Sequence, residues 1–195
     1  PLAAATATLR AGLRDAGNLT ANNASNIATL TIGAQNAAGG SVTINGSYFV
    51  NSTVAIDAQG DIDLNAVTGS QTRIDSVAGH INSTGTLATG GSKLQLNAAT
   101  GIDVNTLATT LSADNETSGN ITIDQIAGQP LQIVTTNFVG IRNQFAGGNI
   151  TVTNADNNIT TTGPIEATGG GNILLDAQLS NIIVGNTVVT GSGNV

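Results

Sequence analysis

The chain of 195 residues carries a net charge of −7 with only five Lys plus Arg residues. This excludes nucleic acid and disfavours anionic lipid surfaces as partners, because both need clustered cations. The content of 39% hydrophobic and only 9% charged residues excludes a disordered chain, and 2% aromatic residues exclude a broad globular core. The absence of cysteine excludes disulfides and zinc–thiolate sites. No stretch approaches the roughly 18 consecutive apolar residues that cross a bilayer.

The first part of the chain, residues 1–39, is the least regular. Leu9 and Leu13 are spaced as in a short helix that caps a domain, whereas residues 5–9 alternate as in a strand, and we favour the strand. We therefore expect one domain over residues 1–195, in which residues 1–39 form its first coils or a cap and residues 40–195 form a repeat shaft.

A short phrase recurs from residue 40 onward: Gly, then Asn or Ser, then two apolar residues one position apart. It begins at Gly40, Gly91, Gly119, Gly148, Gly171 and Gly193. Short units that cannot bury an apolar face alone can do so by stacking, and such repetition is typical of a solenoid. Successive Gly-Asn phrases lie about 20 to 30 residues apart, which predicts one coil per repeat.

The segments between the glycines alternate apolar and polar residues, as strands with one buried face do. The alternation is clearest at residues 54–56, 62–64, 102–104, 121–123 and 150–152. Residues 54–67 align without a gap on residues 94–107, with Asp63 on Asp103, and residues 173–184 repeat the Asp-Ala-Gln of residues 57–59. We predict an all-β chain, a parallel β-helix with coils of about 20–30 residues.

Two stretches interrupt the spacing, residues 108–118 and residues 125–145, and we expect outward loops or a locally wider coil there. Asn and Thr are abundant at the turns. Because Asn tolerates left-handed backbone and hydrogen-bonds locally, we expect stacked Asn side chains to form amide ladders along the axis.

Some of the repeats resemble those of very large bacterial surface proteins of the filamentous-haemagglutinin type. The resemblance rests on residues 118–123, 148–152, 167–178 and 189–195, which share the Gly-Asn phrase. It implies a right-handed parallel β-helix shaft, export across the outer membrane, and a role in adhesion or cell-surface structure. The handedness agrees with the general preference of parallel crossovers. The secretion motif expected at the mature N-terminus of such proteins is not visible, so we expect a shaft fragment.

Parallel β-helices also carry polysaccharide lyases and hydrolases, which place carboxylates beside basic side chains in an open groove. The acidic candidates here are Asp57, Asp61, Asp63 and Asp103. The basic candidates are Arg73, Lys93, Arg142 and His80. Because the basic partners are so few, we predict that the chain is not an enzyme and assign no catalytic, cofactor-binding or metal-binding residue.

The densest acidic run has oxygens on one face. Since Ile62 and Leu64 point inward, Asp61, Asp63 and Asn65 share the outer face, where their oxygens are suited to calcium. The run lacks the glycine and distal glutamate of a calcium loop, so we favour solvated outer positions and predict no cofactor.

Four isolated side chains receive structural interpretations. His80 follows Gly79 without a second His or Cys, and is expected at a surface turn. Lys93 is expected at an outward strand position that keeps the sheet soluble. For Tyr48 and Phe49 we favour core or edge packing over an exposed contact.

Asn-x-Ser/Thr sequons permit glycosylation but do not demand it, because the repeat phrase itself generates Asn-Ile-Thr. They begin at Asn18, Asn23, Asn45, Asn51, Asn82, Asn115, Asn120, Asn149 and Asn158.

Together these features predict an extracellular structural and adhesive shaft module of a large cell-surface protein. The chain begins at Pro1 with no basic stretch before an apolar one, so any export signal is expected outside it. Expected partners are other copies or neighbouring repeats end to end, and surface glycans or host receptors. The alternative is a self-assembling extracellular filament subunit that polymerises through open ends or strand exchange, followed by a polysaccharide-binding or lyase domain.

Overall fold

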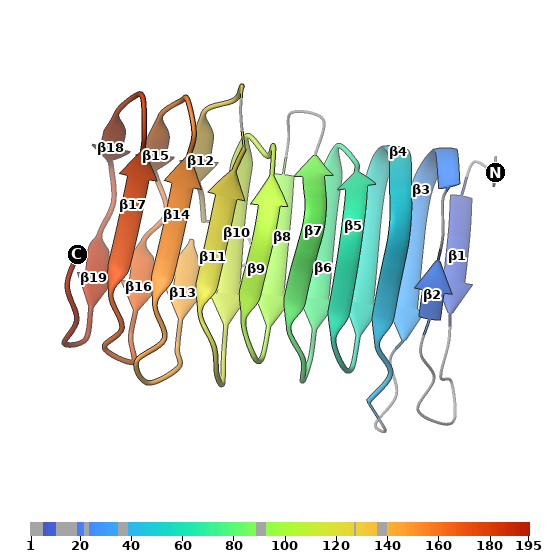
Figure 1. The fold of residues 1–195 in the computed structure, drawn as a ribbon, viewed down its shortest axis with the longest axis horizontal. Coiled ribbons are helices and arrows are strands. Elements are labelled where there is room, and N and C mark those ends of the chain that lie inside the picture. The colour runs from blue at the N-terminus through green and yellow to red at the C-terminus, as the bar shows by residue number, and fades with distance from the viewer. Residues whose placement is uncertain are drawn as a thin grey trace.

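The computed structural model describes residues 6–10, 19–21, 24–34, 39–88, 93–126, 128–135 and 140–195. These residues form a 19-stranded sheet in which the strand pairs are parallel, wound into a solenoid of about seven turns without a helix (Figure 1). In Figure 1 the nearer strands run upward and the farther strands downward as the chain advances from right to left, so the coil is right-handed. The predicted parallel β-helix is confirmed.

Two walls face each other in the N-terminal half of the solenoid. The front wall in Figure 1 consists of β2 (Leu19–Ala21), β5 (Ile62–Thr68), β7 (Ile81–Ala88), β9 (Ile102–Thr106), β11 (Ile121–Gln125), β14 (Ile150–Asn154) and β17 (Ile173–Ala177). The rear wall begins with β1 (Thr6–Arg10), β3 (Ala24–Ala34), β6 (Gln71–Ser76), β8 (Lys93–Ala98) and β10 (Thr110–Asn115). The long strand β4 (Val42–Ala58) pairs with β5 at its start and with β6 at its end, and so contributes to both walls.

The rear wall divides after β10, and the coil gains a third side. Thr110 and Leu111 pair with β12 (Leu131–Ile133), whereas the second half of β10 pairs with β13 (Ile141–Asn143). The strands β15 (Ile159–Thr161) and β18 (Ile182–Val184) continue β12, and β16 (Ile165–Ala167) and β19 (Val188–Thr190) continue β13. One coil therefore grows from 17 residues between Lys93 and Thr110 to 29 residues between Ile121 and Ile150.

The two interruptions of the repeat turn out differently. The wider coil predicted over residues 125–145 is confirmed, although residues 127 and 136–139 lie outside the described part. The loop predicted over residues 108–118 is wrong, because β10 continues the register of β8 through it. Its inward residues include Leu111 and the small Ala113, so the alternation that marks a strand is weak in the sequence.

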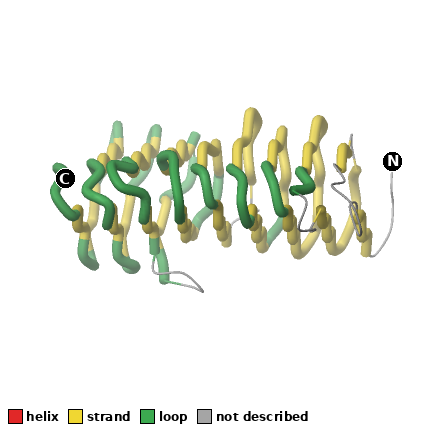
Figure 2. The backbone as a smooth tube through the Cα atoms, turned by 90° about the horizontal axis from the view of Figure 1, so that it is seen from below, coloured by secondary structure: helices red, strands yellow, loops and turns green. Residues whose placement is uncertain are grey.

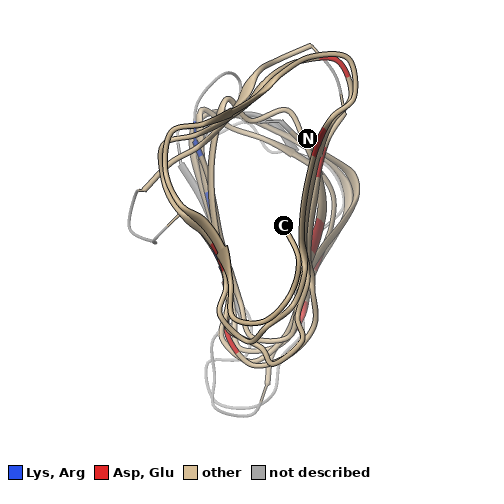
Figure 3. Cartoon of the chain, turned by 90° about the vertical axis from the view of Figure 1, so that its left-hand side faces the viewer, with Lys and Arg blue, Asp and Glu red and all other residues tan. Residues whose placement is uncertain are grey.

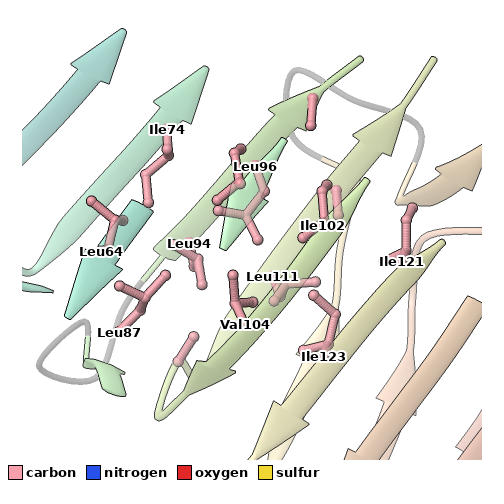
Figure 4. Close-up of a cluster of buried hydrophobic side chains, with 14 of the residues drawn as sticks. Leu64, Ile74, Leu87, Leu94, Leu96, Ile102, Val104, Leu111, Ile121 and Ile123 are labelled. Carbon is pink, nitrogen blue, oxygen red and sulfur yellow. The ribbon is translucent and has the colours of Figure 1, made fainter. Parts of the chain in front are cut away.

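Aliphatic side chains stack in columns between the walls. Each residue of one column is in register with its counterpart one coil away: Ile62, Ile81, Ile102, Ile121, Ile150 and Ile173. All are nearly or fully buried, and Figure 4 shows neighbouring members of the core, such as Leu94 and Val104, between the strands. Burying one such side chain contributes roughly 1.5–3 kcal/mol, so the narrow lumen accounts for the stability of a chain with few aromatic residues.

Successive coils lie side by side along the long axis, with turns along the edges of the shaft (Figure 2). At the corner before the front wall, the backbone N–H of Asn149 donates to Asn120 Oδ1, that of Asn172 to Asn149 Oδ1, and that of Asn194 to Asn172 Oδ1, each at 2.9 Å. At the same corner of the N-terminal coils, the N–H of Asp61 donates to Ser41 Oγ and that of His80 donates to Asp61 Oδ1. Gly101 has no side chain and separates the two ladders. The predicted amide ladder is confirmed.

One rung of this ladder can be tested by substitution. Asn149→Ala removes the acceptor of the Asn172 N–H, and we expect it to lower the free energy of unfolding by about 1 kcal/mol. Asn149→Asp keeps an acceptor oxygen at the same place, so its free energy of unfolding should fall by less than half as much as that of Asn149→Ala. Urea denaturation measures both, and equal losses would show that the side-chain acceptor is not what matters.

Glycine precedes the ladder because neighbouring coils approach closely there. A Cβ added to Gly171 would lie 2.0 Å from the carbonyl oxygen of Gly148, and one added to Gly119 would lie 2.3 Å from that of Thr100. No real Cβ contact is so short. At these two positions the Gly of the repeat phrase is therefore required by backbone packing between coils.

The sequence alignments of the repeats agree only in part with the observed register of the strands. Val54 and Leu94 share a column two coils apart, as the alignment predicts. However, bulges shift the end of the register, so that Val67 pairs with Leu87 and Leu87 with Thr106, not with Leu107. The predicted equivalence of residues 57–59 and residues 176–178 is wrong. The first Asp-Ala-Gln lies at the end of a rear-wall strand, and the second lies at the end of a front-wall strand.

Candidate functional site

The acidic run of the front wall faces a histidine of the next coil. Asp61 Oδ1 lies 3.0 Å from His80 Nδ1, and Asp63 Oδ1 lies 3.2 Å from His80 Nε2. Asn65 instead donates to the carbonyl of Asn45 at 3.2 Å. The outward placement of Asp61, Asp63 and Asn65 is confirmed by the burial of the residues between them, but their side chains contact protein groups and not a common point. In the described residues no group of three or more His, Cys, Asp or Glu side chains could hold a metal ion.

His80 lies at the turn before β7, where the sequence placed it. Its two aspartate partners were not foreseen, because they come from the preceding coil. In the sequence, His80 follows Asp63 by 17 residues and Asp61 by 19 residues. These separations indicate a contact only when the length of that coil is known. Asp103 lies farther along the same wall, in register with Asn82, and is exposed.

On the rear wall, Arg73 lies between two stacked carboxylates. Asp57 and Asp75 are in register on neighbouring strands, where like charges repel. Arg73 Nη1 donates to Asp57 Oδ1 at 2.8 Å and Nη2 donates to Asp75 Oδ2, while Asn97 Nδ2 donates to Asp75 Oδ1 at 3.1 Å. The forked guanidinium thus bonds to both carboxylates, offsets part of their charge and is itself held in a fixed orientation.

A second arginine fixes the place where the rear wall divides. Arg142 on β13 donates through Nε to Asp114 Oδ1 at 3.2 Å and through Nη2 to Asp114 Oδ2, and Gln144 Nε2 donates to the same Oδ1 at 3.2 Å. The side chain of Asp114 is only 5% exposed. The hydrogen bond to Asp114 raises the pKa of Arg142 above its ordinary value. This partly buried pair joins β10 to β13.

A hollow with a volume of about 600 Å³ lies on the outer face of the rear wall. We call it the rear groove. Its outward-facing lining residues are Thr53, Ala55, Gln71, Arg73, Lys93, Gln95 and Thr135. The first six come from β4, β6 and β8, whereas Thr135 follows β12 on the third side, so the groove lies where the two-walled coil meets the three-sided one.

Lysine and arginine gather on the wall that bears the rear groove (Figure 3). Arg73, Lys93 and Arg142 lie on β6, β8 and β13, which belong to one continuous wall. Lys93 is exposed at an outward position, as predicted, and has no ion-pair partner among the side chains described. A smaller hollow of about 420 Å³ on the front wall contains His80 and Asp103 but neither Lys nor Arg. The two walls therefore differ in charge.

Aromatic residues and sequons are divided between structural and exposed positions. Tyr48 is buried, as favoured, whereas Phe49 is 57% exposed, so packing was the wrong interpretation for Phe49. Asn115 is fully buried and donates to the carbonyl of Ser118 at 2.8 Å, which excludes a glycan there. The sequons at Asn18 and Asn23 lie outside the described residues.

The last coil carries exposed apolar residues that sequence reasoning missed. Leu174, Ile183 and Val189 point outward, one on each side of the coil, and are 54%, 48% and 49% exposed. Their counterparts one coil earlier are polar: Thr151, Thr160 and Glu166. The inward residues Ile182 and Val184 are exposed as well. The sequence signal is the replacement of the polar middle residue of each strand triplet by an apolar one.

Comparison with known proteins identifies no relative. No protein-family model, curated protein or solved structure matches the chain. Within the described residues there is also no helix long and apolar enough to span a membrane. The fold, the charges of the two walls and the rear groove are therefore the features from which a function can be inferred.

Proposed function

We propose that the chain is an extracellular, non-catalytic structural and adhesive shaft module of a large cell-surface protein. The observation that carries the proposal is the continuous parallel pairing from β1 to β19, in which each strand is hydrogen-bonded to its counterpart one coil away. A rod joined by such ladders extends without needing a broad core. This is what a module that holds a binding region away from a surface requires.

Two further features support a surface role without catalysis. The Gly-Asn phrases resemble the repeats of filamentous-haemagglutinin-type proteins, and Gly119, Gly171 and Gly193 in these phrases lie where neighbouring coils approach closely. The clustered carboxylates Asp57, Asp75 and Asp114 are each bonded to arginine. A lyase or hydrolase would need such groups free to act on a substrate.

Pulling the chain from its two ends in an optical trap tests the mechanical proposal. We expect stepwise unfolding with length increments of roughly 60–100 Å, because coils of 17 to 29 residues lengthen by up to about 3.5 Å per residue. A fusion of the chain between two domains of known unfolding length serves as the internal control. Unfolding of the whole chain in one step at a force below that of the control domains would contradict a shaft.

The exposed apolar residues of β17–β19 favour a second candidate, a self-assembling extracellular filament subunit. Ile182 and Val184 face the lumen with no coil stacked on them in this chain, and another copy or a neighbouring repeat would cover them. Sedimentation over a wide concentration range separates the candidates. Growth of fibres favours the filament, and one monomeric species at every concentration excludes it.

A further inference from the structure

We propose that the rear groove binds an acidic oligosaccharide, that is, a chain of sugars of which at least one carries a carboxylate. The proposal rests on the adhesive role proposed above, for which it supplies a contact surface. It does not depend on the mechanical behaviour of the shaft. Three properties of the groove lead to it: its shape, its hydrogen-bonding groups and its charge.

The groove is shaped for an extended ligand that lies along the shaft. Its floor is the outer face of three parallel strands, about 4.8 Å apart. Thr53, Gln71 and Lys93 are in register and form one row along the axis. A second row is formed by Ala55, Arg73 and Gln95. Since Ala55 is small and stands beside two long side chains, the second row is hollowed at that end.

The lining side chains can donate and accept hydrogen bonds on every rung. Gln71 and Gln95 each carry an amide with both functions, and Thr53 and Thr135 carry hydroxyl groups. A ligand with hydroxyl groups along its length matches such a surface. The described residues that line the groove are polar, charged or aliphatic, so they would bind a ligand through hydrogen bonds and charge.

The charge of the groove selects a ligand with few negative charges. Lys93 is the cation without an ion-pair partner in the described chain, whereas Arg73 is already bonded to Asp57 and Asp75. Two cations beside two carboxylates leave the groove nearly neutral, which disfavours a densely sulfated or phosphorylated polymer. One carboxylate can be bound at Lys93 through a charge-assisted hydrogen bond, with hydroxyl groups on the remaining residues.

The front wall cannot serve the same ligand. Its outward positions include Asp63, Asp103, Asp124 and Asp176, and the described part of that wall has neither Lys nor Arg. An acidic sugar would be repelled there. Binding is therefore expected on one side of the shaft only, which gives the mutational test a built-in reference surface.

Titration of the chain with defined sugars, followed by NMR, tests the proposal. The probes are trigalacturonic acid and 3′-sialyllactose as acidic sugars from two sources, and lactose as the neutral reference. We expect saturable binding of at least one acidic probe with Kd on the order of 0.1–1 mM, weaker at high salt, and no saturable binding of lactose in that range. The acidic probe that binds identifies the source.

Lys93→Gln is expected to weaken binding about tenfold, because it removes one charge-assisted hydrogen bond. Thr151→Glu is the matched control, since it lowers the net charge by the same amount at an outward position of the front wall, and its affinity should equal that of the wild type. Circular dichroism checks that both variants are folded.

The outcomes separate the two proposals. Absence of binding to both acidic probes, equal binding of lactose, or unchanged affinity in Lys93→Gln would each overturn the groove proposal. If the optical trap still shows coil-by-coil unfolding, the shaft stands without this ligand. If binding is found but the chain unfolds in one weak step, the groove stands and the shaft proposal fails.

Discussion

Gly171→Ala is expected to lower the free energy of unfolding by about 3 kcal/mol. The added Cβ would lie 2.0 Å from the carbonyl oxygen of Gly148 and 2.4 Å from its carbonyl carbon. These atoms belong to the backbone of the neighbouring coil and cannot rotate away. The two coils must therefore separate, which weakens the Asn172 to Asn149 hydrogen bond beside them.

Gly33→Ala is the matched control for this substitution. Gly33 also lies in the solenoid, on β3, but a Cβ there would meet no atom within 4 Å. We expect a change within about 0.5 kcal/mol, because the loss of backbone freedom in the unfolded chain offsets small costs in the strand. Thermal and urea denaturation of both variants measure the difference. Similar stability of the two variants would show that close packing between coils does not explain the glycine of the repeat phrase.

Arg142→Gln is expected to destabilise the chain by about 2–3 kcal/mol. The substitution leaves the carboxylate of Asp114, 5% exposed, with no cation. Removing one partner of a buried ion pair costs about 3–5 kcal/mol, and the 31% exposure of the Arg142 side chain reduces this figure. The loss should appear in the coils that contain β10 and β13, because the pair joins these strands.

A double substitution shows whether the charge is the cause. In Asp114→Asn/Arg142→Gln no buried charge is left, so we expect most of the lost stability to return. The single substitution Asp114→Asn should cost less than Arg142→Gln, because Arg142 reaches solvent and Asp114 does not. If the double variant is as unstable as the sum of the two single variants, packing and not charge maintains the division of the rear wall.

The solenoid itself was predictable because its causes are local. Ile121, Ile150 and Ile173 each follow a Gly-Asn pair, and the structure places all three in one buried column. Period-two alternation decides which side of a strand is buried whatever the neighbouring coil contains. The ladder of Asn side chains was predictable for the same reason, since the Gly-Asn form of the phrase returns at the same corner.

The walls to which the repeats belong were not predictable from similarity alone. The Asp-Ala-Gln of residues 57–59 and that of residues 176–178 look equivalent, yet they lie at the ends of strands on opposite walls. Likewise, the phrase at Gly91 precedes β8 on the rear wall, whereas the one at Gly119 precedes the front wall. Strands of both walls bury one aliphatic face, so their sequences converge on the same pattern.

By itself, then, the amino-acid order determined strands, buried faces and the stacking of coils, because each depends on a few adjacent residues. Only the tertiary structure decided which charges meet. Arg73 reaches Asp57 across 16 residues, and Arg142 reaches Asp114 across 28. Coils differ in length by more than ten residues, so partners one coil apart have no constant spacing. The rear groove also depends on coil length, since it lies where a short coil is followed by a long one.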